Sequence, residues 1–233
     1  MLFFALLILH ISAGSTALGT ALVAMASRKQ AAALHARAGT WFVWSMSAMA
    51  LTGAVLTAWE PDPLTLGSAL WTLSLIHTAR LAARRRDGRL DGWALAAVLP
   101  AIAAVSVLGH GAIMALAAPS GAYLGTDAAG YLVFGGLAAL SVVYDASLLW
   151  RPPLAPRTRI ARHLWRMTLA CFLAVTALFL GQQDDVFPFM QGSPLLLIPS
   201  LLTLGFLLYW SLRVRLARNW LGHRPAPSAK EPK

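Results

Sequence analysis

Seven apolar segments constrain the fold of this 233-residue chain more than any other feature of its sequence. Each is close to the roughly 20 residues that an α-helix needs to cross the hydrocarbon core of a bilayer. The segments cover residues 2–26, 39–59, 64–81, 93–116, 128–150, 164–180 and 195–212. Backbone groups in lipid must be hydrogen-bonded within the protein, and none of these runs alternates as barrel strands do. The sequence therefore predicts an all-α bundle of seven transmembrane helices.

The distribution of charge predicts how this bundle lies in the membrane. Only 12% of the residues are charged and 58% are hydrophobic, whereas a soluble domain carries about 25% charged residues. All 19 Lys and Arg residues fall on one side of the seven segments, between the first and second, third and fourth, and fifth and sixth, and after the seventh. The positive-inside rule then places the N-terminus outside and the C-terminus inside the cell. This segregation also argues against a nucleic-acid partner, despite a formal net charge of +10.

The chain is expected to form one membrane domain over residues 1–220, followed by a Pro-rich polar tail over 221–233 that is typical of disorder. No loop is long enough to hold a flavin or nucleotide domain. The abundance of Arg and Ala is typical of a GC-rich bacterium. We therefore expect a multi-pass protein of the bacterial cytoplasmic (inner) membrane, surrounded by the lipid bilayer.

Two histidines lie deep in apolar segments and are predicted to face the bundle, because an ionisable group avoids lipid. At a helical rise of about 1.5 Å per residue, His10 lies roughly 12 Å and His110 roughly 9 Å below the outer ends of their segments. Gly109 and Gly111 flank His110 and leave room beside it. Two imidazoles at one depth could ligate the iron of a b-type haem. A metal or quinone site, or simple hydrogen bonds to neighbouring helices, are the alternatives.

A second, weaker haem site is predicted nearer the inner surface. His77 and His163 come closest to one depth there, although their depths do not match well. Arg80 could bind the haem propionates, since a guanidinium suits a carboxylate. The alternative, which we favour for the arginines, is that Arg80 extends towards lipid phosphates and pairs with Asp145.

Other chemistries fit the same inner residues. His35, His77 and His163 could bind zinc, with Asp145 as a general base for hydrolysis, but no closely spaced histidine pair supports this. Asp145 and the histidines could instead be the titrating groups of a proton-coupled carrier. A non-catalytic assembly subunit, in which each histidine only makes a polar contact, remains open.

Two stretches carry a resemblance to a known family. "HISAGSTALGTALVAMASRKQAAALHARAGTWFVWSMSAMALTGAVL" resembles the opening of an uncharacterised bacterial integral membrane family, labelled as a domain of unknown function (DUF 2306-like). "RHLWRMTLACFLAVTALFLGQQDDVFP" and the terminal "YWSLRVRLAR" resemble its closing part. The resemblance implies a multi-span membrane protein with His10, His35 and His163 at motif positions, and it implies no known activity.

A looser, fold-level similarity connects the chain with membrane haem proteins of the cytochrome b561-like and ferric reductase-like kind. It rests on histidines at two depths in a small helical bundle. The chain departs from that pattern because no single segment carries two histidines about a dozen residues apart. The leading hypothesis is electron transfer across the membrane through haem b, to or from a quinone or an external acceptor. Without a soluble redox domain, the electrons would come from a mobile carrier or a redox partner protein.

Overall fold

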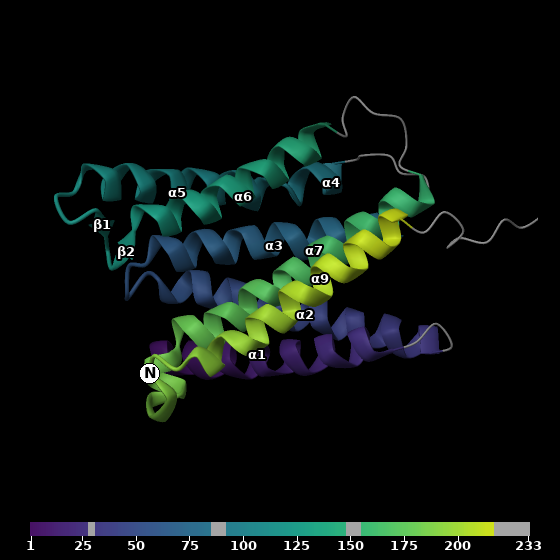
Figure 1. Cartoon of the computed structure of the whole chain (residues 1–233), viewed down its shortest axis with the longest axis horizontal. Helices are drawn as coiled ribbons and strands as arrows, with labels where there is room; N and C mark the ends of the chain where they lie inside the picture. The colour runs from purple at the N-terminus through teal and green to yellow at the C-terminus, as the bar shows by residue number, and fades with distance from the viewer. Residues whose placement is uncertain (28–30, 85–91, 148–154, 217–233) are drawn as a thin grey trace, which may run out of the picture.

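The computed structural model describes residues 1–27, 31–84, 92–147 and 155–216, and it confirms an all-α bundle (Figure 1). The long helices are α1 (Leu2–Ala26), α2 (Ala32–Leu56), α3 (Pro63–Arg84), α5 (Leu99–Ala117), α6 (Ala128–Ser147), α7 (Pro156–Thr176) and α9 (Ile198–Leu216). The short elements are α4 (Gly92–Ala96), β1 (Ala122–Tyr123), β2 (Thr126–Asp127), η3 (Ala177–Gly181), α8 (Gln183–Val186), η4 (Pro188–Met190) and η5 (Pro194–Leu197). The predicted disordered tail at 221–233 and the end of the 128–150 segment lie outside the described residues.

Six helices of the described chain are long and apolar enough to cross a membrane, which makes this a multi-pass membrane protein. They cover Leu2–Ala26, Ala32–Leu56, Gly92–Ala117, Ala128–Ser147, Pro156–Gly181 and Pro194–Val214. The predicted 64–81 segment, which corresponds to α3, is not among them. Ten of the 22 residues of α3 are buried, including Ser74 and Thr78, and its last turn carries Arg84. A helix that packs against protein can carry polar residues that lipid would not accept.

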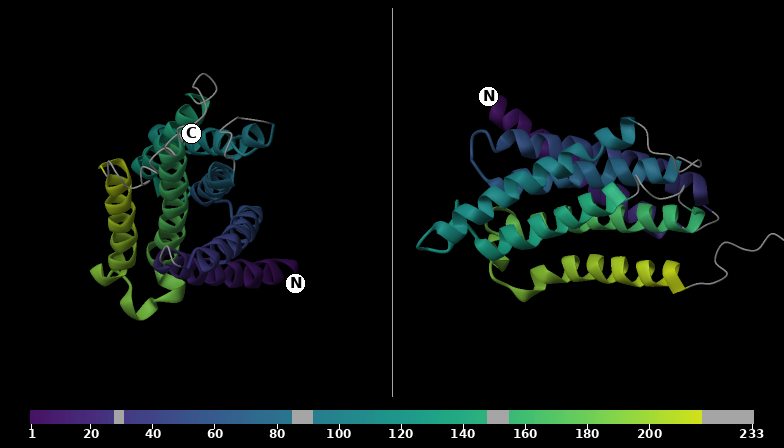
Figure 2. Two further views of the ribbon diagram at one scale, coloured as in Figure 1. Left: turned by 90° about the vertical axis from the view of Figure 1, so that its right-hand side faces the viewer. Right: turned by 90° about the horizontal axis from the view of Figure 1, so that it is seen from above.

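The helix α3 lies in the middle of the bundle. It packs against α2, α5 and α7 and touches α6, while α1 packs on α2 and α9 packs on α7. Figure 1 shows α5 and α6 on one side of α3, and α2 and α1 on the other. In the left view of Figure 2, α7 lies between α9 and the central helices. The pairs α1–α2 and α5–α6 are therefore separated by α3.

Local sequence explains where the helices break and approach one another. Pro100 lies in the first turn of α5, and α4 ends at Ala96, where the proline ring would otherwise clash with the carbonyl four residues earlier. Small residues of α1 (Ala13, Ala17) are buried, and a Cβ on Gly14 would lie 3.2 Å from the sulfur of Met49 in α2. Small faces allow membrane helices to pack closely in this way.

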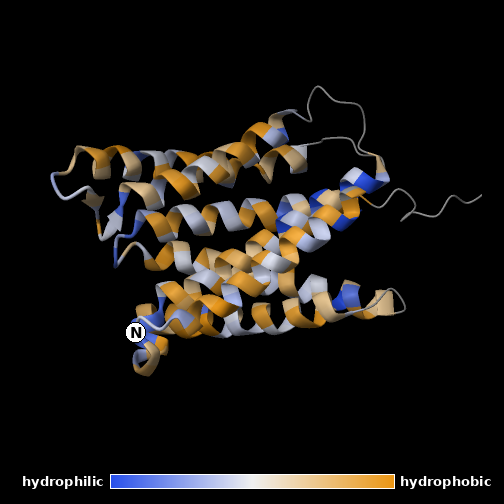
Figure 3. Cartoon of the chain, in the orientation of Figure 1, coloured by the Kyte–Doolittle hydropathy of each residue, from blue (hydrophilic) through white to orange (hydrophobic). Residues whose placement is uncertain are grey.

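The two ends of the bundle carry opposite charge. The acidic end holds the β1–β2 hairpin, α8 and the α2–α3 connection, with the acidic residues Glu60, Asp62, Asp127, Asp184 and Asp185. The basic end is where α3 and α9 end and α7 begins. Hydrophobic residues cover the helix bodies between the two ends (Figure 3). The described arginines at the helix termini thus lie at one end, as the charge pattern predicted.

Candidate functional site

A buried ionic cluster joins α6 to α7 near the basic end. Asp145 of α6 accepts two hydrogen bonds on Oδ1, from Nη2 of Arg162 and Nη2 of Arg166, each of 2.6 Å. The three side chains are almost completely buried: Asp145 is 4% exposed, Arg162 7% and Arg166 0%. One carboxylate thus meets two guanidiniums, and the cluster has a formal charge of +1.

The positions of the two arginines follow from helical spacing. Arg162 and Arg166 are four residues apart on α7 and therefore share a face. Arg166 also donates through Nη1 to Thr78 Oγ1 of α3, and its guanidinium lies 4.7 Å from the centre of the Trp165 ring. These contacts link α3, α6 and α7 at the centre of the bundle. Burying charges costs free energy unless they are paired and hydrogen-bonded, so this set of partners is what makes the arginines tolerable there.

The cluster corrects the sequence-based pairing of Asp145 with Arg80. The guanidinium of Arg80 lies 5.5 Å from the centre of the Trp44 ring of α2. Asp145 faces α7, whereas Arg80 lies towards α2. The prediction failed because the rotation of each helix about its axis, and hence the partner that each side chain meets, depends on packing.

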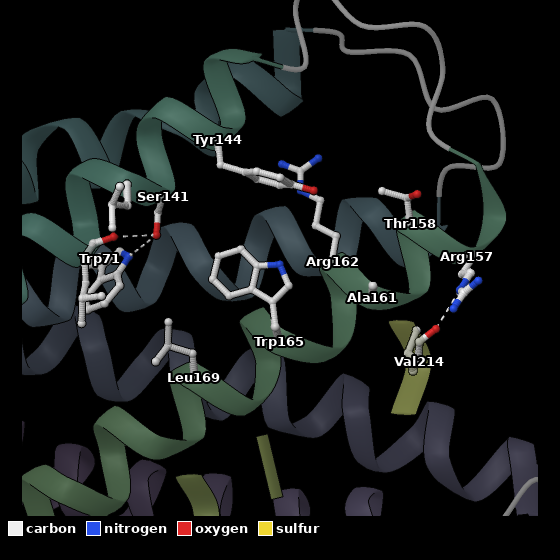
Figure 4. Close-up of a pocket in the computed structure, with 12 residues that line it drawn as sticks. Trp71, Ser141, Tyr144, Arg157, Thr158, Ala161, Arg162, Trp165, Leu169 and Val214 are labelled. Carbon is white, nitrogen blue, oxygen red and sulfur yellow. Dashed lines mark hydrogen bonds between the residues drawn. The ribbon is translucent and has the colours of Figure 1, made fainter. Parts of the chain in front are cut away.

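A cavity of about 480 Å³ lies beside the cluster. Its walls come from α6 and α7, with Trp71 of α3 and Val214 of α9 completing it. Figure 4 shows Tyr144, Arg162 and Trp165 pointing towards one another in its middle, and Arg157 near its far end. Arg157 is held there by a 2.7 Å hydrogen bond from its Nε to the carbonyl oxygen of Val214. The cavity therefore has a basic part next to the buried cluster.

Within the cavity wall, two helices are tied together by a hydrogen bond. The indole Nε1 of the fully buried Trp71 donates to Ser141 Oγ at 3.2 Å. Ser141 in turn donates to the carbonyl oxygen of Leu137 at 3.0 Å. The polar atoms of Trp71 and Ser141 are thus already hydrogen-bonded within the protein.

His10 contacts the neighbouring helix α2. Its Nδ1 donates to the carbonyl oxygen of Met49 at 2.9 Å and lies 3.2 Å from Thr52 Oγ1. The ring also packs on Gly53, where an added Cβ would lie 3.0 Å from His10 Cε1. His10 thus makes an interhelical hydrogen bond through Nδ1.

His110 lies on a different part of the bundle. It is exposed on α5, with its ring edge-to-face against Tyr123 at a centroid distance of 6.2 Å. The space beside Gly111 is filled by the Tyr131 ring, which would lie 2.5 Å from an added Cβ. Because α2 and α3 lie between α1 and α5 (Figure 1), the structure does not bring His10 and His110 together. The predicted outer haem site has no geometric support.

The inner histidines also bind separate protein groups. His77 Nε2 lies 3.2 Å from Ser47 Oγ of α2, and His163 Nδ1 donates to the carbonyl oxygen of Ala79 at 3.2 Å. His35, which is exposed, donates to the carbonyl oxygen of Ala24 at 2.9 Å. Across the described ranges, no three His, Cys, Asp or Glu side chains are grouped so that they could hold a metal ion. The part of the chain that the structure describes therefore groups no candidate zinc ligands.

Sequence reasoning missed the two arginines that matter most here. By charge pattern alone, Arg162 and Arg166 belong to the basic flank of a helix, as anchors at the membrane surface. A usable signal is present, because "RHLWR" puts two arginines on one helical face directly before an apolar run. Asp145, an isolated acid inside a segment, is the obvious counter-ion.

Comparisons with protein-family models, curated proteins and solved structures find no match for this chain. The resemblance to the DUF 2306-like family and the similarity to membrane haem proteins therefore stay predictions. What can be inferred about function comes from the geometry of the buried cluster and its cavity.

Proposed function

We propose that this protein is a seven-helix carrier-type membrane protein that binds an anionic substrate in the cavity beside Asp145, Arg162 and Arg166. In this proposal the N-terminus lies outside and the basic end faces the cytoplasm of a bacterium. Such a carrier would recognise an anion and would not depend on proton exchange by Asp145 and the histidines.

Two observations support seven crossings and this orientation. The 22 residues of α3 extend about 33 Å at a rise of about 1.5 Å per residue, enough for a hydrocarbon core of about 30 Å. Its first residue follows the acidic α2–α3 connection, and its last turn lies at the basic end. A seventh crossing by α3 puts the basic residues on one side of the membrane, in agreement with the positive-inside rule.

The single observation that carries the proposal is the unequal charge of the cluster beside a cavity. Both guanidiniums share Oδ1 of Asp145, so one positive charge has no counter-charge within the cluster. An uncompensated charge in a low-dielectric interior is costly, and an anion in the adjoining cavity would lower that cost. Arg162 belongs both to the cluster and to the cavity wall, so it is the residue through which such an anion would be bound.

Anion recognition agrees better with the geometry than electron transfer does. Electron transfer through a bis-histidine haem requires two imidazoles on opposite sides of one iron, and His10 and His110 each contact a different part of the protein. The ionic cluster, in contrast, adjoins a cavity that is lined by one further basic side chain, Arg157. Buried ionisable residues in membrane segments commonly mark substrate or ion pathways.

Thermal unfolding of the purified full-length protein with added inorganic phosphate tests the proposal. At phosphate concentrations about ten times the Kd, we expect stabilisation of about 1.4 kcal/mol and a rise in Tm of about 3 °C. The rise should be lost in Arg162→Gln and retained in Arg37→Gln, which removes the same charge from an exposed position. Arg162→Lys, which restores the charge, should recover part of it.

Equal phosphate shifts in Arg162→Gln and Arg37→Gln would show a general salt effect and overturn the proposal. The absence of any phosphate shift in the wild-type protein would do so as well.

A further inference from the structure

The cavity between α6 and α7 is basic at one end and apolar at the other. Arg157, Thr158 and Arg162 line the part nearest the start of α7. Leu137, Leu140, Leu169 and the buried face of Trp71 line the part towards the middle of the bundle. A small hydrophilic anion would fill only the first part and leave the apolar part without a suitable occupant.

The length of the cavity wall corresponds to about half a bilayer. From Arg157 to Leu169, α7 advances 12 residues, which is about 18 Å at a rise of about 1.5 Å per residue. One leaflet of a hydrocarbon core of about 30 Å is about 15 Å deep. The cavity therefore runs from the level of lipid head groups to the depth that acyl chain ends reach.

Two leucines in the apolar part of the cavity are exposed on the outside of the bundle. Leu137 and Leu140 are 44% and 66% exposed, although both line the cavity. They belong to the middle of α6, a helix that Figure 3 colours largely as hydrophobic. The cavity is thus open sideways, at a level where lipid rather than water surrounds a membrane helix.

The basic part has an unused hydrogen-bond donor. Nε of Arg162 has no hydrogen-bond partner among the described residues, although only 7% of the side chain is exposed. A buried N–H without a partner is unfavourable, because it has lost its hydrogen bond to water and gained none in the protein. An acidic group in the cavity could accept this hydrogen bond while it balances the excess charge of the cluster.

We propose that the substrate is a single-chain amphiphile with an acidic head group, which enters sideways from the cytoplasmic leaflet. The head group binds at Arg157 and Arg162, and the chain lies along Leu137, Leu140 and Leu169. This inference rests on the proposed function and specifies its substrate class. The alternative is a water-soluble anion that reaches the same arginines from the cytoplasm.

The test compares dodecyl phosphate with inorganic phosphate on the full-length protein in phosphatidylcholine nanodiscs, with Tm as the readout. We expect dodecyl phosphate to give half its maximal Tm shift at a concentration at least about tenfold lower than inorganic phosphate does. Its chain partitions into the bilayer, which raises its concentration at the depth of the cavity. Dodecyl trimethylammonium, with the same chain and the opposite charge, should give no stabilising shift.

Two matched substitutions on α6 test where the alkyl chain of dodecyl phosphate binds. Leu137→Trp narrows the apolar part of the cavity, whereas Leu132→Trp places the same ring on an exposed position of α6 that does not line the cavity. We expect Leu137→Trp to reduce the ratio of the half-maximal concentrations of inorganic phosphate and dodecyl phosphate at least about fivefold. The Tm shift with inorganic phosphate should stay unchanged. Leu132→Trp should behave as wild type. Arg157→Gln provides a second test of the head-group site if Arg162→Gln does not fold.

The outcomes separate this inference from the proposed function. Equal potency of dodecyl phosphate and inorganic phosphate, with both Tm shifts lost in Arg162→Gln or Arg157→Gln, would overturn the proposal of an amphiphilic substrate. It would leave the proposal of anion binding intact. If dodecyl phosphate stays equally more potent than inorganic phosphate in Leu137→Trp, the proposal of an amphiphilic substrate in this cavity would also be overturned. Responses that do not depend on either arginine would overturn both.

Discussion

Asp145 and Arg166 form an ion pair of 2.6 Å, and the guanidinium-bearing side chain has no exposed surface. The pair connects α6 to α7, while the contact from Arg166 to Thr78 extends it to α3. Because α3 packs against α2, α5 and α7, this network connects the ionic cluster to the central helix of the bundle. Substitutions of Asp145 test the stability of the cluster, and substitutions of Arg162 and Arg157 test anion binding.

The carboxylate of Asp145 is expected to be essential for stability. Asp145→Asn leaves two buried guanidiniums without a negative partner, and breaking a buried ion pair in this way costs about 3–5 kcal/mol. We expect a large fall in Tm of the purified protein, with Asp145→Glu recovering part of it. Asp185→Asn, at an exposed position, is the control and should change Tm little. A stable Asp145→Asn protein would show that the cluster is dispensable for folding.

Two glycines of α5 should respond oppositely to alanine. A Cβ on Gly111 would lie 2.5 Å from the ring of the fully buried Tyr131, whereas nothing lies within 4 Å of one on Gly109. Overpacking costs about 1–3 kcal/mol, so Gly111→Ala should lower Tm. Gly109→Ala should be neutral or stabilising by up to about 1 kcal/mol, because alanine favours a helix. Equal effects of the two substitutions would mean that α5 and α6 do not pack as described.

The two deep histidines should differ in their effect on stability. His10→Ala removes a hydrogen bond between α1 and α2, and such bonds in membrane proteins contribute about 0.6 kcal/mol on average and up to about 1.7. His110 is exposed, so His110→Ala should leave Tm nearly unchanged. Absorption spectra of the same variants, expressed with added haem, provide a check. A Soret band that is present in the wild-type protein and lost in both variants would support a haem site shared by His10 and His110.

Labelling of single cysteines should locate the two ends of α3. Cys171 is buried and serves as an unreactive background. We expect an impermeant maleimide to label Glu60→Cys in intact cells and Ala83→Cys only after permeabilisation, since these exposed positions lie at opposite ends of α3. Labelling of both positions from the same side would show that α3 does not cross the membrane.

Helices could be predicted from the sequence because their formation depends on local properties. A long apolar run in lipid satisfies its backbone hydrogen bonds internally, and α1 has the same bounds, Leu2–Ala26, as the first predicted segment. The segregation of basic residues likewise requires only the order of segments along the chain. The α3 helix shows where hydropathy becomes an incomplete guide, since a helix among other helices tolerates serine, threonine and arginine.

The partners of individual side chains were decided only by the tertiary structure. His10 contacts Met49 rather than His110, and Asp145 contacts Arg162 rather than Arg80. Sequence spacing shows which residues share a face of one helix, but the neighbour that this face meets depends on how all the helices pack and rotate together. The apolar pattern and charge order were thus sufficient for a membrane bundle, whereas the ionic cluster and its cavity required the packed arrangement of α3, α6 and α7.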